Sequence, residues 1–278
     1  MNIPHSTISG ATHVVGVCGH GIDYTLSPAM HNAAFQACGL DYVYVRFDVA
    51  PGSAEAASGG IRGLGLAGVN VTKPLKTEMI PFLDDITEEA RQIGSVNTII
   101  NRGGVLSGAS TDGVGLQRAL DAMDTPVSGK RVVILGAGGT ARAACAMCRS
   151  AGAAHTTIAA RNREQAQDTA SVGEAAVASL EPGDLGEAIQ MSDLIINAVP
   201  TDLTVEASWF SGHQTVYDTR YDVADTILMK RAGENGARTA NGIDMLLFQG
   251  AASFEMWTGH EPPTGAMRNA LVMVLKNR

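Results

Sequence analysis

The sequence has few cysteines, no long apolar run and no signal peptide, which are the features of secreted and membrane proteins. It has only four cysteines in 278 residues, and their spacing does not form a disulfide framework. No apolar run reaches the roughly 18 residues that a membrane span requires. The first residues also lack the basic segment and apolar core of a signal peptide. We therefore expect a cytoplasmic protein with reduced thiols and no membrane partner.

Basic residues are also in short supply. The sequence has 20 lysines and arginines against 28 aspartates and glutamates, which gives a formal net charge of −8. Nucleic acid binding needs a basic face that neutralises phosphates, so we expect no nucleic acid partner. The seven histidines show no H-E-x-x-H or similar spacing, so we also expect no metal.

The rest of the composition is that of a soluble globular protein, with 45% hydrophobic and 17% charged residues. Apolar runs that alternate with helical patterns predict an α/β protein. In the first half we expect strands at 13–19, 42–49 and 68–76, the last broken by a proline, and a hairpin of 96–101 with 105–109. In the second half we expect buried strands at 132–135, 156–160, 193–199 and 215–218, joined by helices in a doubly wound parallel sheet.

The length of the chain fits two domains of ordinary size. We place the first at 1–111 and the second, built on the parallel sheet, at 112–244. Two helices, at 245–258 and 264–277, end the chain, and we expect residues 245–278 to fold back on the first domain.

Two shorter helices are expected in the first half. Ser27 precedes Pro28, which predicts Ser27 as an N-cap with proline at the first helical position. Alternatively, Thr25 and Ser27 aim both hydroxyls at one acceptor near the helix start. A second helix is expected over 84–93, with acidic residues in its first turn.

The most informative motif follows the apolar run at 132–135. Gly136, Gly138 and Ala141 form the pattern G-x-G-x-x-A between this expected strand and a helix-forming segment. Strand, glycine turn and helix in this order are typical of a dinucleotide site, with the pyrophosphate at the helix N-terminus. We expect the cofactor to lie on Gly136, Ala137, Gly138, Gly139 and Thr140.

The residues after the next strand indicate which dinucleotide binds. NAD enzymes usually place an acidic residue there on the ribose hydroxyls. This chain has Arg161, Asn162 and Arg163 at that point, with no acid before Glu164. An arginine pairs well with a 2′-phosphate, so NADP is favoured over NAD. The alternative is that Arg161 and Arg163 are only solvated residues at a helix start.

Other residues offer competing interpretations. Lys76 and Asp112 are polar residues at segment ends, and a lysine with a carboxylate moves a hydroxyl proton without a metal. Taken singly each fits a surface charge, and composition does not separate Lys76 from Lys73. Cys145 and Cys148 form a C-x-x-C inside an expected helix, which we interpret as buried thiols and not as a redox or zinc motif.

Laid side by side, these segments resemble the shikimate dehydrogenase family along nearly the whole chain. Residues 68–76 match its G-x-N-V-T-x-P-x-K, whose final lysine is catalytic, and this selects Lys76 over Lys73. Residues 94–98 resemble its G-A-V-N-T, and 111–113 resemble its N-T-D-G, in which Asp112 is the catalytic aspartate. Residues 244–259 resemble its C-terminal signature, in which Gln249 is a substrate ligand.

The resemblance implies reversible reduction of 3-dehydroshikimate with NADPH, by a substrate domain with a mixed sheet and a Rossmann domain that face each other across a cleft. It implies catalysis by Lys76 and Asp112, with either a monomer or a homodimer as the assembly. The implied ligands of the hydroxycyclohexene carboxylate substrate are Thr25, Ser27, Asn70, Thr72, Asn97, Tyr221 and Gln249. The implied cofactor residues, beyond the glycine loop and Arg161, are Asn162, Ala198, Val199, Gly242 and Met245.

The chain departs from the family pattern near the expected substrate. Gly21, Tyr24 and Thr25 replace its usual proline, histidine and first serine, and Val199 replaces a threonine near the nicotinamide. These changes keep the reaction type and leave open quinate, or another relative of shikimate, with either nucleotide. A catalytically weak protein that senses the metabolite and NADPH is a further alternative, against which the retained Lys76 and Asp112 argue.

Overall fold

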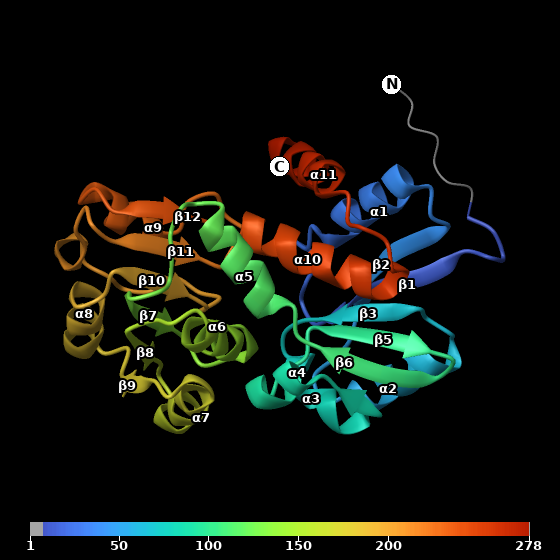
Figure 1. The fold of residues 1–278 in the computed structure, drawn as a ribbon, viewed down its shortest axis with the longest axis horizontal. Helices are drawn as coiled ribbons and strands as arrows, with labels where there is room; N and C mark the ends of the chain where they lie inside the picture. The colour runs from blue at the N-terminus through green and yellow to red at the C-terminus, as the bar shows by residue number, and fades with distance from the viewer. Residues whose placement is uncertain (1–7, 278) are drawn as a thin grey trace. The chain divides into compact units, whose positions relative to one another are not determined.

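Two six-stranded sheets, one in each of two units of the chain, organise the structure (Figure 1). The structure is a computed structural model that describes residues 8–277. One unit runs to Thr111 and resumes at Leu247, and the other covers Asp112–Leu246. The second crossing between the units therefore falls inside helix α10 (Ile243–Thr258), two residues later than the expected boundary at 244/245.

The first unit contains a mixed sheet, as the sequence predicts. Its strands are β1 (His13–Gly19), β2 (Tyr42–Asp48), β3 (Gly68–Val71), β4 (Asp85–Ile86), β5 (Thr98–Arg102) and β6 (Val105–Ala109). They are ordered β2-β1-β3-β5-β6-β4. β1 pairs in parallel with β2 and β3, whereas β5 runs antiparallel to both β3 and β6. The carboxyl ends of β1, β3 and β6 therefore share one edge of the sheet with the amino end of β5.

Helices cover this sheet and supply the aromatic part of its core. They are α1 (Ser27–Cys38), α2 (Ala54–Gly63), α3 (Leu75–Glu78), α4 (Glu88–Ile93), α11 (Thr264–Lys276), the larger part of α10 and a 3-10 turn, η1 (Ile80–Phe82). Trp257 of α10 is buried, and its Nε1 donates to the carbonyl of Ile99 at 3.0 Å. A Cβ on Gly68 would lie 2.4 Å from that same Nε1, so only glycine lets the indole approach β3 this closely.

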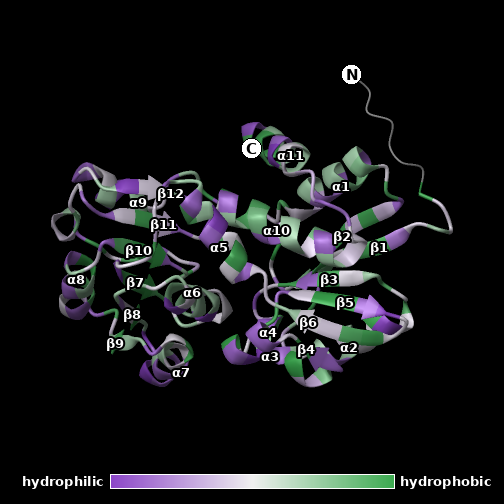
Figure 2. Cartoon of the chain, viewed as in Figure 1, coloured by the Kyte–Doolittle hydropathy of each residue, from purple (hydrophilic) through white to green (hydrophobic). Residues whose placement is uncertain are grey.

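The second unit contains the doubly wound sheet that the sequence predicts. Its strands are β7 (Arg131–Leu135), β8 (His155–Ala159), β9 (Ala176–Ala178), β10 (Leu194–Asn197), β11 (Thr215–Asp218) and β12 (Arg238–Ala240). Every pairing is parallel, in the order β12-β11-β10-β7-β8-β9. The strand order reverses between β7 and β10, which is where such sheets bind ligands. Figure 2 shows the central strands as hydrophobic, consistent with helices on both faces.

The helices of the second unit are α5 (Asp112–Asp121), α6 (Gly139–Ser150), α7 (Arg163–Gly173), α8 (Pro182–Gln190), α9 (Ile227–Glu234), the start of α10 and a 3-10 turn, η2 (Ala207–Trp209). Cys145 and Cys148 lie on α6 and are buried, as expected. Burial raises the pKa of the Cys145 thiol to about 11 and that of Cys148 to about 12, so both are poor nucleophiles.

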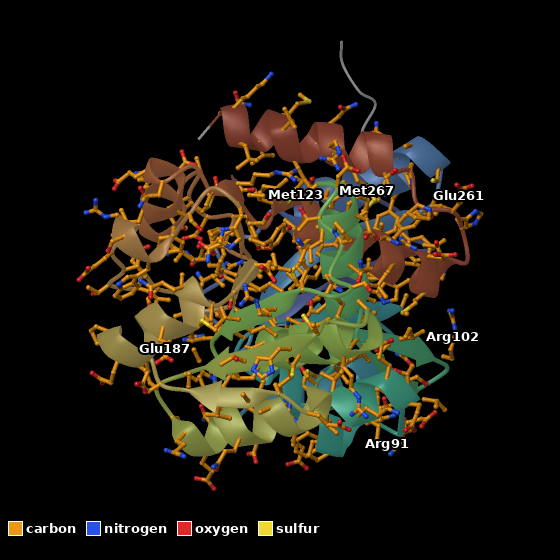
Figure 3. All side chains as sticks on the ribbon, turned by 60° about the vertical axis from the view of Figure 1, so that its left-hand side comes forward. Arg91, Arg102, Met123, Glu187, Glu261 and Met267 are labelled. Atoms are coloured by element: carbon orange, nitrogen blue, oxygen red, sulfur yellow. The ribbon has the colours of Figure 1, made fainter. Side chains whose placement is uncertain are left out.

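Charged and apolar side chains separate in the usual way. Arg91 and Arg102 of the first unit and Glu187 of the second are exposed, whereas Met267 of α11 is fully buried (Figure 3). Within residues 8–277, none of the helices combines the length and the apolar character needed to span a bilayer.

Two local predictions are wrong. Ser27 is not an N-cap: Leu26 occupies that position, Ser27 is the first helical residue, and no side chain caps the helix. Residues 84–93 are not one helix, because Asp84 is fixed from outside the segment: its carboxylate accepts from Arg62 at 2.6 Å and from the Leu106 amide at 2.7 Å. The following residues pair as β4, and α4 begins only after Thr87, which accepts from the Ala90 amide.

Candidate active site

Polar residues gather at the shared edge of the first sheet. Backbone hydrogen bonds join its strand ends: the Val71 amide donates to the Asn97 carbonyl at 2.8 Å, and the Asn97 amide donates to the Ala109 carbonyl at 3.0 Å. The Thr72 amide donates to the Cys18 carbonyl at 2.9 Å. Three predicted substrate residues therefore lie at one edge: Asn70 and Thr72 at the end of β3, and Asn97 just before β5.

The amide of Asn97 is held in one orientation by the backbone. The Thr111 amide donates to Asn97 Oδ1 at 2.8 Å, and a backbone N–H can only donate, so this atom is the oxygen. Asn97 Nδ2 donates to Thr111 Oγ1 at 2.9 Å and to Gln249 Oε1 at 3.2 Å. The side-chain oxygen of Gln249 therefore faces the Asn97 amide, and these two predicted residues meet although they are far apart in sequence.

The amide of Asn70 is fixed in the same way. Its Nδ2 donates to the Asn97 carbonyl at 3.1 Å, which can only accept, and to Ser253 Oγ at 2.9 Å. Its Oδ1 accepts from the Tyr44 hydroxyl at 2.8 Å. Both amide protons are thus used inside the protein, and what Asn70 offers a ligand is the second lone pair of its oxygen.

The predicted pair Thr25 and Ser27 stands at the start of α1. Thr25 Oγ1 donates to Ser27 Oγ at 3.3 Å and also accepts from the Ser27 amide at 3.3 Å. The segment before them is tied to the end of β3, because the His20 amide donates to the Lys73 carbonyl at 3.1 Å. The two hydroxyls therefore lie within hydrogen-bonding distance of each other, and the interpretation that both aim at one acceptor stays a prediction.

The two candidate lysines have different surroundings. Lys76 is half-buried on α3, and its backbone carbonyl accepts from the amide of Val96 at 2.9 Å. Val96 directly precedes Asn97 in the chain. Lys73 is exposed, and its ammonium lies 5.2 Å from the centre of the Tyr24 ring, a cation–π arrangement. Asp112 is buried at the first residue of α5, in the second unit, and directly follows Thr111.

The glycine loop of the second unit has the form that the motif predicts. Gly136 has a φ of 109°, and α6 begins at Gly139 with Gly138 at its N-cap and no acidic residue in its first turn. The Ala198 amide donates to the Leu135 carbonyl at 2.8 Å. A Cβ on Gly136 would lie 3.3 Å from the Ala198 carbonyl and 3.4 Å from Val199 Cγ2. The structure thus brings Ala198 and Val199 against the loop.

The predicted phosphate residues follow β8. Arg161 is exposed, and within residues 8–277 its guanidinium has no carboxylate partner. The Asn162 side chain has a structural role, because its Oδ1 accepts from the Gln165 amide at 3.1 Å and caps α7. The arginine side chain is therefore available for an anionic ligand at the carboxyl edge of the sheet.

The loops after β11 and β12 and the first turn of α10 hold the remaining predicted residues of the second unit. The Gly242 amide donates to the Arg220 carbonyl at 2.8 Å, and the Met245 amide donates to the Tyr217 hydroxyl at 3.0 Å. Arg220, beside Tyr221, pairs with Asp202 at 2.8 Å and with Asp222 at 3.0 Å. The Asp222 carboxylate raises the pKa of Arg220. These ion pairs connect the loops after β10 and β11.

Several of these polar contacts are absent from the sequence predictions. Tyr44, Thr98, Thr111 and Ser253 are buried and hydrogen-bonded around Asn70 and Asn97. Ser253 lies one helical turn after Gln249 on the same face of α10, a spacing that could have pointed to it. The described residues contain no group of three or more His, Cys, Asp or Glu side chains placed to hold a metal ion.

Three parts of the chain match domains of one enzyme family. Residues 17–99 match the shikimate dehydrogenase substrate binding domain, and residues 118–211 match shikimate / quinate 5-dehydrogenase. Residues 242–272 match the shikimate 5′-dehydrogenase C-terminal domain. The shikimate dehydrogenase (NADP(+)) of Symbiobacterium thermophilum is 39% identical over 293 residues, covering 100% of both chains. This chain belongs to the shikimate dehydrogenase family.

Solved structures of the family share the fold. The shikimate 5-dehydrogenase of Thermus thermophilus, in complex with NADP(H) and shikimate, is 30% identical, with a TM-score of 0.85 over 94% of this chain and 99% of that one. The quinate dehydrogenase of Corynebacterium glutamicum, in complex with NAD, is 28% identical, with a TM-score of 0.84 over the same shares of the chains. The Rossmann-type fold and the family membership predicted from sequence are confirmed.

Proposed function

We propose that this chain is an NADP-dependent oxidoreductase that interconverts shikimate and 3-dehydroshikimate. The observation that carries this proposal is the edge of the first sheet, where Asn70, Asn97 and Gln249 form a cluster with fixed hydrogen-bonding directions beside Lys76. A ring with several hydroxyls needs directional donors and acceptors of this kind. The full-length similarity to shikimate dehydrogenases that use NADP(+) supports the choice of substrate and cofactor.

The second unit fits NADP. The loop at residues 136–139 has no side chain larger than the methyl group of Ala137, and the first turn of α6 offers its N–H groups to a pyrophosphate. Arg161 is free of protein carboxylates and suits a 2′-phosphate. We assign Thr140, Asn162, Ala198, Val199, Gly242 and Met245 to the same cofactor. When bound, NADP accepts the hydride from the alcohol carbon or returns it to the ketone.

The first unit fits the substrate, and its geometry divides the work between side chains. Thr25 and Ser27 have adjacent hydroxyls, and we assign them to the carboxylate, which accepts several hydrogen bonds. Asn70 has no amide proton left over and is assigned to a ring hydroxyl, from which its oxygen accepts. We assign Thr72, Asn97 and Gln249 of this unit, and Tyr221 of the second unit, to the remaining hydroxyls.

Lys76 and Asp112 are assigned to the proton. As the alcohol is oxidised, its O–H proton must leave the oxygen while the hydride leaves the carbon. A lysine and a carboxylate at that oxygen receive the proton in this direction and return it when the ketone is reduced. No metal is needed, because the two side chains supply both the charge and the proton.

Steady-state kinetics with shikimate and quinate, each with NADP⁺ and NAD⁺, test the proposal by the absorbance of the reduced nucleotide. We expect the highest kcat/KM with shikimate and NADP⁺. Quinate is the second candidate, because Tyr24 and Thr25 depart from the usual family pattern and a quinate dehydrogenase shares the fold. A higher kcat/KM with quinate than with shikimate would make quinate the substrate. No activity with any pair of substrate and nucleotide would make a sensing protein the better interpretation.

Two lysine variants sharpen this test. Lys76→Ala should lower kcat by about a hundredfold to ten-thousandfold, the range typical of a lost acid–base group. Binding of shikimate, followed by calorimetry, should remain measurable. Lys73→Ala is the matched control, since Lys73 is exposed on the Tyr24 ring, and its kcat should stay close to that of the wild type. The reverse pattern would transfer the proton role to Lys73.

A further inference from the structure

Two buried side chains that carry no assigned role hold the amide of Asn70. Tyr44 is 1% exposed and Ser253 is 0% exposed, so neither touches solvent. The Tyr44 hydroxyl donates to Asn70 Oδ1 at 2.8 Å, and Ser253 Oγ lies 2.9 Å from Asn70 Nδ2. We propose that Tyr44 and Ser253 are positioning residues that keep the oxygen of Asn70 turned toward a hydroxyl of the substrate. This inference rests on the proposed function.

The protons on Ser253 decide the direction of its bond to Asn70. Ser253 Oγ donates its single proton to the Gln249 carbonyl, 3.0 Å away and one helical turn earlier. It therefore accepts from Asn70 Nδ2, 2.9 Å away. Ser253 thus recognises the nitrogen of the Asn70 amide and not its oxygen.

A rotated Asn70 amide would mismatch two of its four hydrogen bonds, those to the Asn97 carbonyl and to Ser253 Oγ. Its oxygen would then face the Asn97 carbonyl and Ser253 Oγ, neither of which has a proton to give in this arrangement. Its nitrogen would face the Tyr44 hydroxyl, which would then have to accept a hydrogen bond in place of the one it donates. In a buried setting such unmatched polar contacts are costly, so the observed orientation is strongly preferred.

Tyr44 is itself held on two sides. Asn32 bridges its backbone, accepting from the Tyr44 amide at 2.8 Å and donating to the Tyr44 carbonyl at 2.9 Å. The Tyr44 ring stacks on His31 with 4.4 Å between ring centres and 9° between planes. Backbone and ring are both fixed, so the hydroxyl reaches Asn70 from a constant direction.

The test removes each contact with the smallest change that the chain offers. Tyr44→Phe deletes one hydroxyl. Ser253→Ala deletes another, and alanine is well tolerated at this position in a helix because of its high helix propensity. Each variant should lower kcat/KM for shikimate by about tenfold, the equivalent of one buried hydrogen bond. The KM for NADP⁺ should stay at the wild-type value, because Asn70 belongs to the substrate side.

Matched controls come from the same unit. Tyr42→Phe changes a tyrosine two residues away on β2 whose hydroxyl has no partner within residues 8–277. Ser58→Ala changes a serine that is 2% exposed and whose Oγ lacks a hydrogen-bond partner. Both controls should keep kcat/KM for shikimate within about twofold of the wild type, since no hydrogen bond is lost.

A double-mutant cycle separates positioning from general destabilisation. In an Asn70→Ala background, Tyr44→Phe and Ser253→Ala should have no further effect on kcat/KM, because the amide they orient is gone. Full additivity in that background would overturn the proposal, as would variants that behave like their controls. If the wild type itself fails to turn over shikimate, the proposed function falls and this inference falls with it. Wild-type turnover with unaffected variants would remove only the inference.

Discussion

His31 gives the first unit a specific sensitivity to acid. Its ring is 0% exposed, and neither ring nitrogen has a hydrogen-bond partner among residues 8–277. It lies against aromatic rings, with Tyr44 at 4.4 Å and Trp257 at 5.3 Å between ring centres. Burial away from any polar partner lowers the pKa of His31 from 6.5 to about 3. The folded unit therefore keeps this ring neutral at pH values where the unfolded chain protonates it.

The size of the effect follows from the two pKa values. The folded pKa is depressed, so below pH 6.5 the unfolded state binds the extra proton and the folded state loses stability as the pH falls. Between pH 7.5 and 5.5 the loss is about 1.4 kcal/mol, and between pH 7.5 and 4.5 it is about 2.6 kcal/mol. Below about pH 3 the folded ring protonates as well, and the dependence ends.

Urea unfolding at a series of pH values between 4.5 and 7.5 measures this dependence. The chain has two tryptophans, and Trp257 in the first unit is the useful reporter. A Trp209→Phe background removes the signal of the second unit. The measured quantity is the unfolding free energy of this protein minus that of the same protein with His31→Leu, which cannot titrate. Taking the difference cancels other groups, including Glu89, whose pKa burial raises.

The expected outcome is a free-energy difference that changes by about 1.4 kcal/mol per pH unit below pH 6. Asp84 does not contribute here, because Arg62 and the Leu106 amide hold the pKa of its carboxyl below 3.8. Equal pH dependence in both proteins would refute the reasoning. Such a result would mean that His31 finds a proton acceptor or solvent in the folded state.

Three further predictions concern the second unit and the thiols. Arg161→Ala should raise the KM for NADP⁺ by about tenfold to a hundredfold, because a charge-assisted hydrogen bond is lost. The kinetics with NAD⁺ should stay unchanged, and Arg163→Ala is the control in the same assay. Gly242→Ala puts a Cβ 2.0 Å from the Thr219 carbonyl and should lower the free energy of unfolding in urea by more than about 2 kcal/mol. The control is Gly233→Ala on α9, where a Cβ meets open space, and it should not lower the free energy of unfolding. Ellman's reagent should modify Cys38 in the native protein and all four thiols only in urea, because Cys18, Cys145 and Cys148 are buried; rapid native reaction of all four would contradict this.

The sequence predicted the elements that depend on local pattern. Strands β1 and β11 have the predicted bounds, and each pairs in parallel with a strand on either side. The glycine loop was equally clear, since its strand, turn and helix follow one another directly in the chain.

Elements that depend on distant partners were beyond local pattern. The contact that breaks the expected helix at Asp84 comes from Arg62, and the partners of Asn70 include Ser253, 183 positions away. The family resemblance predicted Asn70 as a substrate ligand. Only the folded chain shows that both protons of its side-chain amide already donate hydrogen bonds inside the protein. The roles assigned to Lys76 and Asp112 stay predictions until their variants are measured.

The contact between Gly68 and Trp257 limits how this sequence can evolve. Every residue except glycine carries a Cβ, and at position 68 that atom would fall 2.4 Å from the indole nitrogen and 2.5 Å from the Ile99 carbonyl. No single substitution at Gly68 is therefore neutral, and a smaller residue at position 257 would relieve only the contact with the indole, not the one with the Ile99 backbone. We expect relatives with this sheet to keep glycine at position 68 even where position 257 changes.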